Sequence, residues 1–137
     1  MTNLPSTFLT MLTLITADGK LELSLARKPM PTPRDHEVLV KVLATPINPS
    51  DLGLLVGAAD ISTLRASEKE GLPFLTADVP EAGLRAMQGR IGEALPIGNE
   101  GCGTVVSAGA SAEAQALLGK TVALLGGEIY AEYRCLP

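Results

Sequence analysis

The segment Glu37-Val-Leu-Val-Lys-Val-Leu-Ala44 decides the fold class, because it carries the clearest strand pattern in the 137-residue chain. Its even-numbered positions from 38 to 44 are valine or alanine, whereas Leu39 and Leu43 flank Lys41 at the odd-numbered positions. Alternation with period two and β-branched residues predicts a strand with one buried face. Pro46 follows, and we expect the strand to end there because proline lacks the N–H that a sheet requires.

The segments before this strand predict a hairpin and a connector. Apolar residues fill 9–15, leucines alternate with other residues over 21–25, and Asp18-Gly19 lies between the two runs. This arrangement indicates a β-hairpin around an Asp-Gly turn. Prolines then occupy alternate positions from Pro29 to Pro33. They predict an extended surface connector, since proline is excluded from central strands.

After the strand, Asn48-Pro-Ser-Asp51 has turn chemistry. We expect Ser50 or Asp51 to cap a short helix over 52–56, which Gly57 closes. Further along, the pattern predicts strands at 101–108, 121–125 and 130–136, with a helical turn at 112–118.

Residues 58–95 form a long insertion in this series of strands. Two pieces, Ile61–Lys69 and Pro80–Gln88, have helical spacing that prolines and glycines interrupt. We therefore expect one or two short helices there. Short strands with Gly and Pro turns are typical of a partly open β-barrel. The expected fold is one mainly-β domain with short helices over residues 1–137.

Composition excludes several function classes. The chain is 46% hydrophobic and 19% charged, with 11 basic and 15 acidic residues and a net charge of −4. Nucleic acid is not an expected partner, because backbone phosphates require clustered Lys and Arg. The apolar stretch at 8–15 is too short to span a membrane and no basic residue precedes it. We expect a cytoplasmic protein with no membrane partner.

The motifs that mark common active sites are incomplete. Gly101-Cys102-Gly103 begins a dinucleotide fingerprint, but Val106 stands at the third glycine position and the residues between predict a strand. His36 is the only histidine and is expected at the surface, and Cys102 and Cys135 are expected to be free thiols. We therefore expect no Rossmann site, metal site or Ser-His-Asp arrangement in this chain.

A resemblance to a known family rests on motifs that occur in order along the chain. They are the strand at 37–44, Asn48-Pro-Ser-Asp51, Pro96-Ile-Gly-Asn-Glu-Gly101, Gly103-Thr-Val-Val-Ser-Ala-Gly109, Leu118-Gly-Lys-Thr-Val122 and Tyr130-Ala-Glu-Tyr133. This series resembles the N-terminal domain of the medium-chain dehydrogenase/reductase superfamily. The resemblance implies a GroES-like, partly open β-barrel that packs against a following Rossmann domain, with the active site between them.

The resemblance also implies a branch of that superfamily. Asn48 and Asn99 stand where zinc alcohol dehydrogenases carry a Cys and a His ligand, and a neutral carboxamide binds zinc poorly. The chain is similar to the zinc-independent quinone oxidoreductases and enoyl-thioester reductases. These enzymes transfer hydride from NADPH or NADH to a quinone or an enone. The cofactor is expected on the Rossmann domain, which this chain lacks, so the isolated chain is expected to be inactive and the complete enzyme homodimeric.

The resemblance assigns candidate site residues. Asn48 is the expected catalytic residue, contacting the nicotinamide ribose or the substrate carbonyl; the alternative is a turn-forming Asn. Ser50, Asp51, Asn99 and Glu100 complete the expected cleft. Asp51 has the alternative role of a helix cap, and residues 99–100 that of holding a turn. Ala59 stands where many of these reductases carry a substrate-orienting Tyr, and therefore substrate identity is left open.

Two functions of other classes stay open. The same small barrel occurs in co-chaperonins, which are ring-forming interaction proteins without catalysis. A domain that has lost catalysis and only binds is the second alternative, and Ala59 motivates it.

Overall fold

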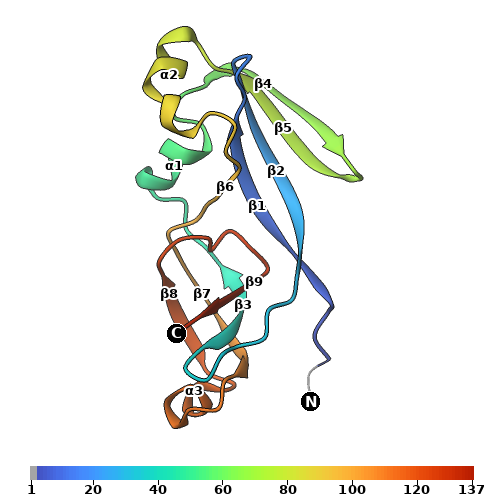
Figure 1. Cartoon of the computed structure of the whole chain (residues 1–137), viewed down its shortest axis with the longest axis vertical. Coiled ribbons are helices and arrows are strands. Elements are labelled where there is room, and N and C mark those ends of the chain that lie inside the picture. The colour runs from blue at the N-terminus through green and yellow to red at the C-terminus, as the bar shows by residue number, and fades with distance from the viewer. Residues whose placement is uncertain (1–2) are drawn as a thin grey trace. The chain divides into compact units, whose positions relative to one another are not determined.

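The structure is a computed structural model that describes residues 3–137, and it confirms a mainly-β fold. Two open antiparallel sheets have the strand orders β4-β5-β2-β1-β6 and β8-β7-β3-β9 (Figure 1). The strands described are β1 (Thr7–Ile15), β2 (Lys20–Pro29), β3 (Val38–Ala44), β4 (Asp60–Lys69), β5 (Leu72–Asp78), β6 (Leu95–Pro96), β7 (Glu100–Ala108), β8 (Thr121–Leu125) and β9 (Tyr133–Leu136). The helices described are α1 (Pro49–Leu55), α2 (Glu81–Ala86), α3 (Ala112–Leu117) and a 3-10 turn, η1 (Gln88–Arg90).

The chain divides into two compact units. Of the described residues, unit 1 contains 3–10, Arg27–Pro46 and Gly98–Pro137, and unit 2 contains Met11–Ala26 and Ile47–Ile97. None of the helices within residues 3–137 is long and apolar enough to cross a membrane.

Unit 1 is built on β3, as the alternating segment predicts. This strand pairs with β7 on one side and β9 on the other. Its valines pack with Val105, Ala114, Leu124 and Ile129 in a buried core. Strands β3 and β7 lie unusually close at Gly103, where an added Cβ would meet the carbonyl oxygen of Lys41 in β3. Glycine at that position is therefore required by packing rather than by backbone conformation.

The last strand is shorter than the sequence predicts. It begins at Tyr133 instead of residue 130. Three consecutive residues, Gly126, Gly127 and Glu128, have positive φ angles of 118°, 85° and 60°. This left-handed stretch turns the chain, so residues 129–132 do not continue the strand. They pair at separate points instead, such as the bridge between Ala131 and Thr10 and the hydrogen bond from the Val42 N–H to the carbonyl of Glu132.

Unit 2 contains the predicted hairpin from Met11 in β1 to Ala26 in β2; the outer ends of both strands belong to unit 1. Gly19 has a φ of 87° in the Asp-Gly turn between them. Its core is made of Ile15, Leu21, Ala77 and Val79. The residues of β2 pair with β5 in register from Lys20 opposite Asp78 to Leu23 opposite Leu75. The apolar face predicted for 21–25 is therefore partly covered by the insertion.

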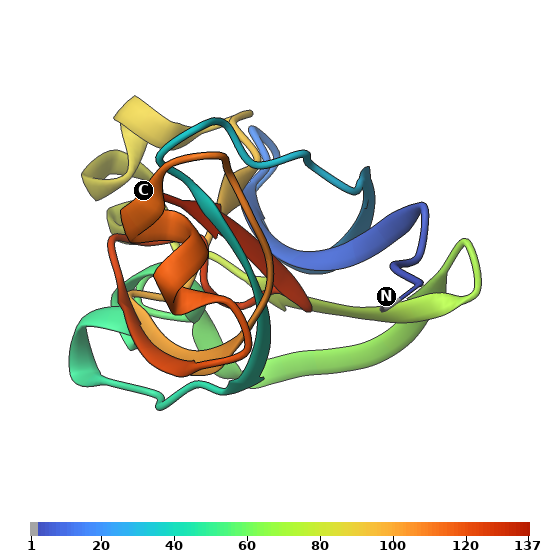
Figure 2. The same ribbon diagram turned by 90° about the horizontal axis from the view of Figure 1, so that it is seen from below.

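The insertion itself differs from the expectation. Ile61–Lys69 is not helical: it lies within β4, which forms a hairpin with β5, and the two strands run side by side in Figure 2. The connecting residues Glu70 and Gly71 both have positive φ angles, 53° and 75°. Two positive φ angles are the geometry of a type I′ turn, which favours a hairpin over a helix. The second expected helix is confirmed as α2, followed by η1.

Candidate functional site

The turn at 48–51 begins α1, but not as the sequence predicts. The helix runs over 49–55 instead of 52–56, and its N-cap is Asn48 rather than Ser50 or Asp51. Asn is among the best N-cap residues, and Pro49 suits the first helical position because its φ is fixed and its missing N–H has no helical partner. The turn and the helix are therefore one structural feature, with Asn48 at its first position.

Asp51 is the third helical residue and completes a capping box with Asn48. One of its carboxylate oxygens accepts a 2.8 Å hydrogen bond from the backbone N–H of Asn48. Asp51 is only 1% exposed, whereas Ser50 is exposed and Asn48 half-buried. Asp51 therefore takes part in capping, as expected, but its side chain bonds to the N-cap residue Asn48 and Asp51 is not itself the N-cap.

Asn99 and Glu100 lie where β7 begins, beside a tight turn. The carbonyl of Asn99 accepts from the backbone N–H of Gly126 at 3.2 Å, and that of Gly98 accepts from Ile129 at 3.1 Å. Gly98 has a φ of 102°, and an added Cβ would lie 2.4 Å from the backbone nitrogen of Tyr130. The backbone of this segment therefore holds the turn, and the side chain of Asn99 is exposed.

The five candidate residues fall into two groups. Asn48, Ser50 and Asp51 belong to unit 2 and are brought together by the N-terminus of α1. Asn99 and Glu100 belong to unit 1 and stand side by side at the start of β7.

One positioning residue was not identified from the sequence. Arg90 donates from Nη2 to Thr13 Oγ1 at 3.0 Å, and Thr13 donates to the carbonyl oxygen of Leu54 in α1 at 2.9 Å. Burial lowers the pKa of the Arg90 guanidinium, and its Nε is buried without a hydrogen-bond partner in the described part of the chain. Thr13 is fully buried, so this relay ties η1 and β1 to α1. No motif surrounds Arg90, and only the fold brings it to Thr13.

The residues considered for metal or nucleophilic chemistry are dispersed. Across residues 3–137, no three His, Cys, Asp or Glu side chains form a metal-binding group. His36 is exposed, and Cys102 and Cys135 are half-buried free thiols. Burial, as the larger cause, and the nearby carboxylate of Glu37 together raise the pKa of Cys135 to about 11. Its thiol is therefore protonated at neutral pH and is a poor nucleophile.

No model of a known protein family matches this chain, and no curated protein matches it.

Proposed function

We propose that residues 1–137 are the GroES-like substrate domain of a zinc-independent, NAD(P)H-dependent oxidoreductase that reduces a quinone or an enone. The proposal is supported by the ordered motifs from 37 to 133. The observation that carries it is the turn at 48–51, in which a capping box joins Asn48 to Asp51 at the first turn of α1. A carboxamide held in this way is suited to orient a reacting carbonyl.

The segment Gly101-Cys102-Gly103 does not have the form of a dinucleotide-binding turn. The fingerprint requires a glycine-rich turn that opens a helix, but Gly101 and Gly103 both lie inside β7, which continues to Ala108. The proposal therefore assigns the nicotinamide cofactor to a separate Rossmann domain. Substrate positioning is the part assigned to these residues.

Asn48 is the proposed catalytic residue. Its side chain can donate a hydrogen bond to an oxygen that gains negative charge as the substrate is reduced. A donor fixed before the reaction stabilises that charge without reorganisation. Asp51 is a positioning residue in this proposal, because its buried carboxylate bonds to the backbone of Asn48.

The test is a hydride-transfer assay on a protein that contains these residues together with its Rossmann domain. NADPH and NADH, each deuterated at C4, are offered with a quinone and separately with an enoyl thioester. We expect deuterium on the β-carbon of the reduced thioester, or stoichiometric nucleotide oxidation with the quinone. Failure of all four combinations contradicts the proposal.

A further inference from the structure

A cavity of about 270 Å³ lies entirely within unit 1. Its lining comes from three segments, at 8–10, 28–31 and 128–135. The volume is slightly below the range of about 300–1,000 Å³ that is usual for small-molecule sites, so any ligand is small. None of the candidate residues of the proposed oxidoreductase site lines this cavity.

Two cations line the cavity, and they differ in how they are held. Arg134 is restrained on three sides: Nε donates to Gly127 O at 3.2 Å, Nη1 donates to Cys135 O at 3.0 Å, and Nη2 lies 3.4 Å from Glu128 Oε2. Lys28 is half-buried and forms no ion pair with any of the residues 3–137. Glu128 also lines the cavity, so the lining carries one positive charge in excess.

A buried threonine also lines this space. Thr10 is 3% exposed, and its hydroxyl is the donor that we assign to a bound ligand. A hydrogen bond from this hydroxyl to a charged ligand oxygen would add to the free energy of binding.

The remaining walls are apolar and partly aromatic. The rings of Phe8 and Tyr133 meet edge to face, with centroids 6.3 Å apart and planes at 73°. Pro29 and Pro31 complete this part of the lining. An edge-to-face pair offers a surface on which a further ring can pack.

We propose that this cavity binds a small aromatic carboxylate. The ring packs against Phe8 and Tyr133, and the carboxylate binds the ammonium group of Lys28 and accepts from Thr10. A single excess positive charge matches a monoanion, and the restrained Arg134 contributes a fixed positive potential beside it. This site is independent of the proposed oxidoreductase activity.

The probe is benzoate, titrated into the isotope-labelled 137-residue chain and followed by amide chemical shifts. We expect saturable shifts confined to the three lining segments, with a Kd of about 1 mM, as suits so few ligand atoms. Benzamide keeps the ring but lacks the negative charge, and acetate keeps the carboxylate but lacks the ring. Both are expected to bind at least about tenfold more weakly than benzoate. Equal binding of all three, or shifts scattered over the surface, overturns the proposal.

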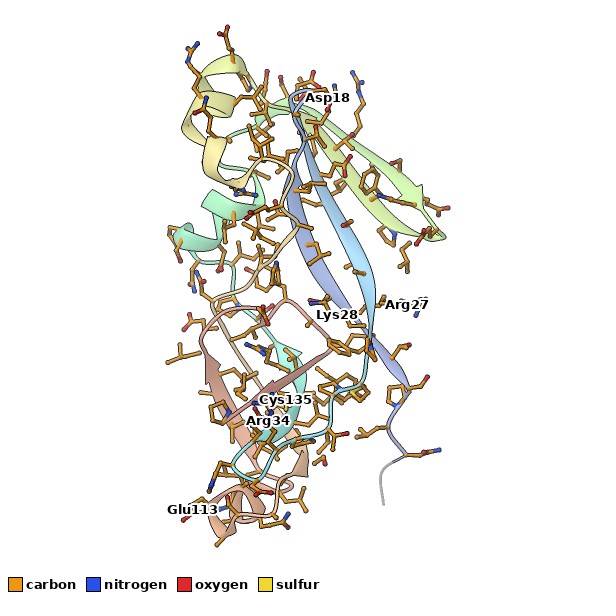
Figure 3. All side chains as sticks on the ribbon, viewed as in Figure 1. Asp18, Arg27, Lys28, Arg34, Glu113 and Cys135 are labelled. Carbon is orange, nitrogen blue, oxygen red and sulfur yellow. The ribbon has the colours of Figure 1, made fainter. Side chains whose placement is uncertain are left out.

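Arg27 provides a matched control for Lys28. The two neighbouring cations lie on opposite sides of β2 in Figure 3, and only Lys28 lines the cavity. Lys28→Gln should weaken benzoate binding about tenfold, whereas Arg27→Gln, with the same change in net charge, should leave it unchanged. Thr10→Val should weaken it about three- to tenfold. If both Gln variants remain folded, as their chemical-shift dispersion would show, and lose benzoate affinity equally, the proposal of a specific site is contradicted.

Discussion

The backbone N–H of Asn48 donates a 2.8 Å hydrogen bond to the buried carboxylate of Asp51, at the first turn of α1. This bond joins the proposed catalytic residue to the helix that begins beside it. Asn48 therefore has two roles to be separated, the helix cap that the structure shows and the contact with substrate that we propose. Substitutions at 48 and 51 distinguish them.

Asp51→Ala should lower the free energy of unfolding by about 1–2 kcal/mol, because it removes the capping-box acceptor and leaves the Asn48 N–H without it. Asp51→Asn keeps an acceptor oxygen and should cost less. Urea denaturation of both variants measures the difference. Equal stability of wild type and Asp51→Ala would show that the bond contributes nothing.

Gly103→Ala should destabilise unit 1 by more than about 2 kcal/mol, since its Cβ would lie 2.2 Å from Lys41 O and 2.6 Å from a methyl of Val40. Gly53→Ala is the matched control, because nothing lies within 4 Å of its Cβ and it occupies α1. That substitution should stabilise the chain by about 0.4–1 kcal/mol. Thermal unfolding of both variants checks the prediction, and a tolerated Gly103→Ala would mean that β3 and β7 are not so closely packed.

Alkylation of Cys135 should be slow and strongly pH-dependent. Burial and the carboxylate of Glu37 raise its pKa to about 11, so at pH 8 its thiolate fraction is about 100-fold below that of an ordinary cysteine. In a Cys102→Ser chain, the rate with iodoacetamide should rise about tenfold per pH unit up to about pH 11. Glu37→Gln removes the carboxylate and should shift this profile to lower pH. A rate that levels off between pH 8 and 9 is inconsistent with the raised pKa.

Trypsin should cut first in β4, after Arg65 or Lys69. This strand forms an edge of its sheet and nearly all its residues are exposed, so it separates from the fold easily. Lys41 is the internal control: its side chain is also exposed, but its strand is paired on both sides. Mass spectrometry of the first fragments identifies the site, and early cutting after Lys41 would contradict this order of stability.

Local sequence patterns predict the parts of the fold in which the spacing of apolar residues and the residues of the turns indicate the same structure. The alternation at 38–44 and the Asp18-Gly19 turn specify β3 and the first hairpin, because each signal lies within a few residues of the element it determines. The hairpin of β4 and β5 was missed because Glu70-Gly71 is a less typical pair for a type I′ turn. The helical spacing over 61–69 predicts a helix there instead.

The site was predicted only in part. The turn at 48–51 is local and was recognised, although the cap was assigned to Ser50 or Asp51 instead of Asn48. The contact of Arg90 with Thr13 and the grouping of Thr10 with Lys28 around one cavity join segments far apart in sequence. No periodicity or motif encodes such contacts, because they depend on how the sheets bring these segments together.

The most direct test of the proposed function is the turnover of Asn48→Ser in a protein that contains its Rossmann domain. Serine caps a helix as well as asparagine does, so the unfolding free energy should change by less than about 0.5 kcal/mol. The carboxamide is lost, however, and removal of one transition-state donor typically lowers turnover by about 10²–10³-fold. Asn48→Ala should lose both turnover and about 1 kcal/mol of stability. A folded Asn48→Ser enzyme with wild-type turnover would show that Asn48 is a helix cap alone and contradict its assignment to the active site.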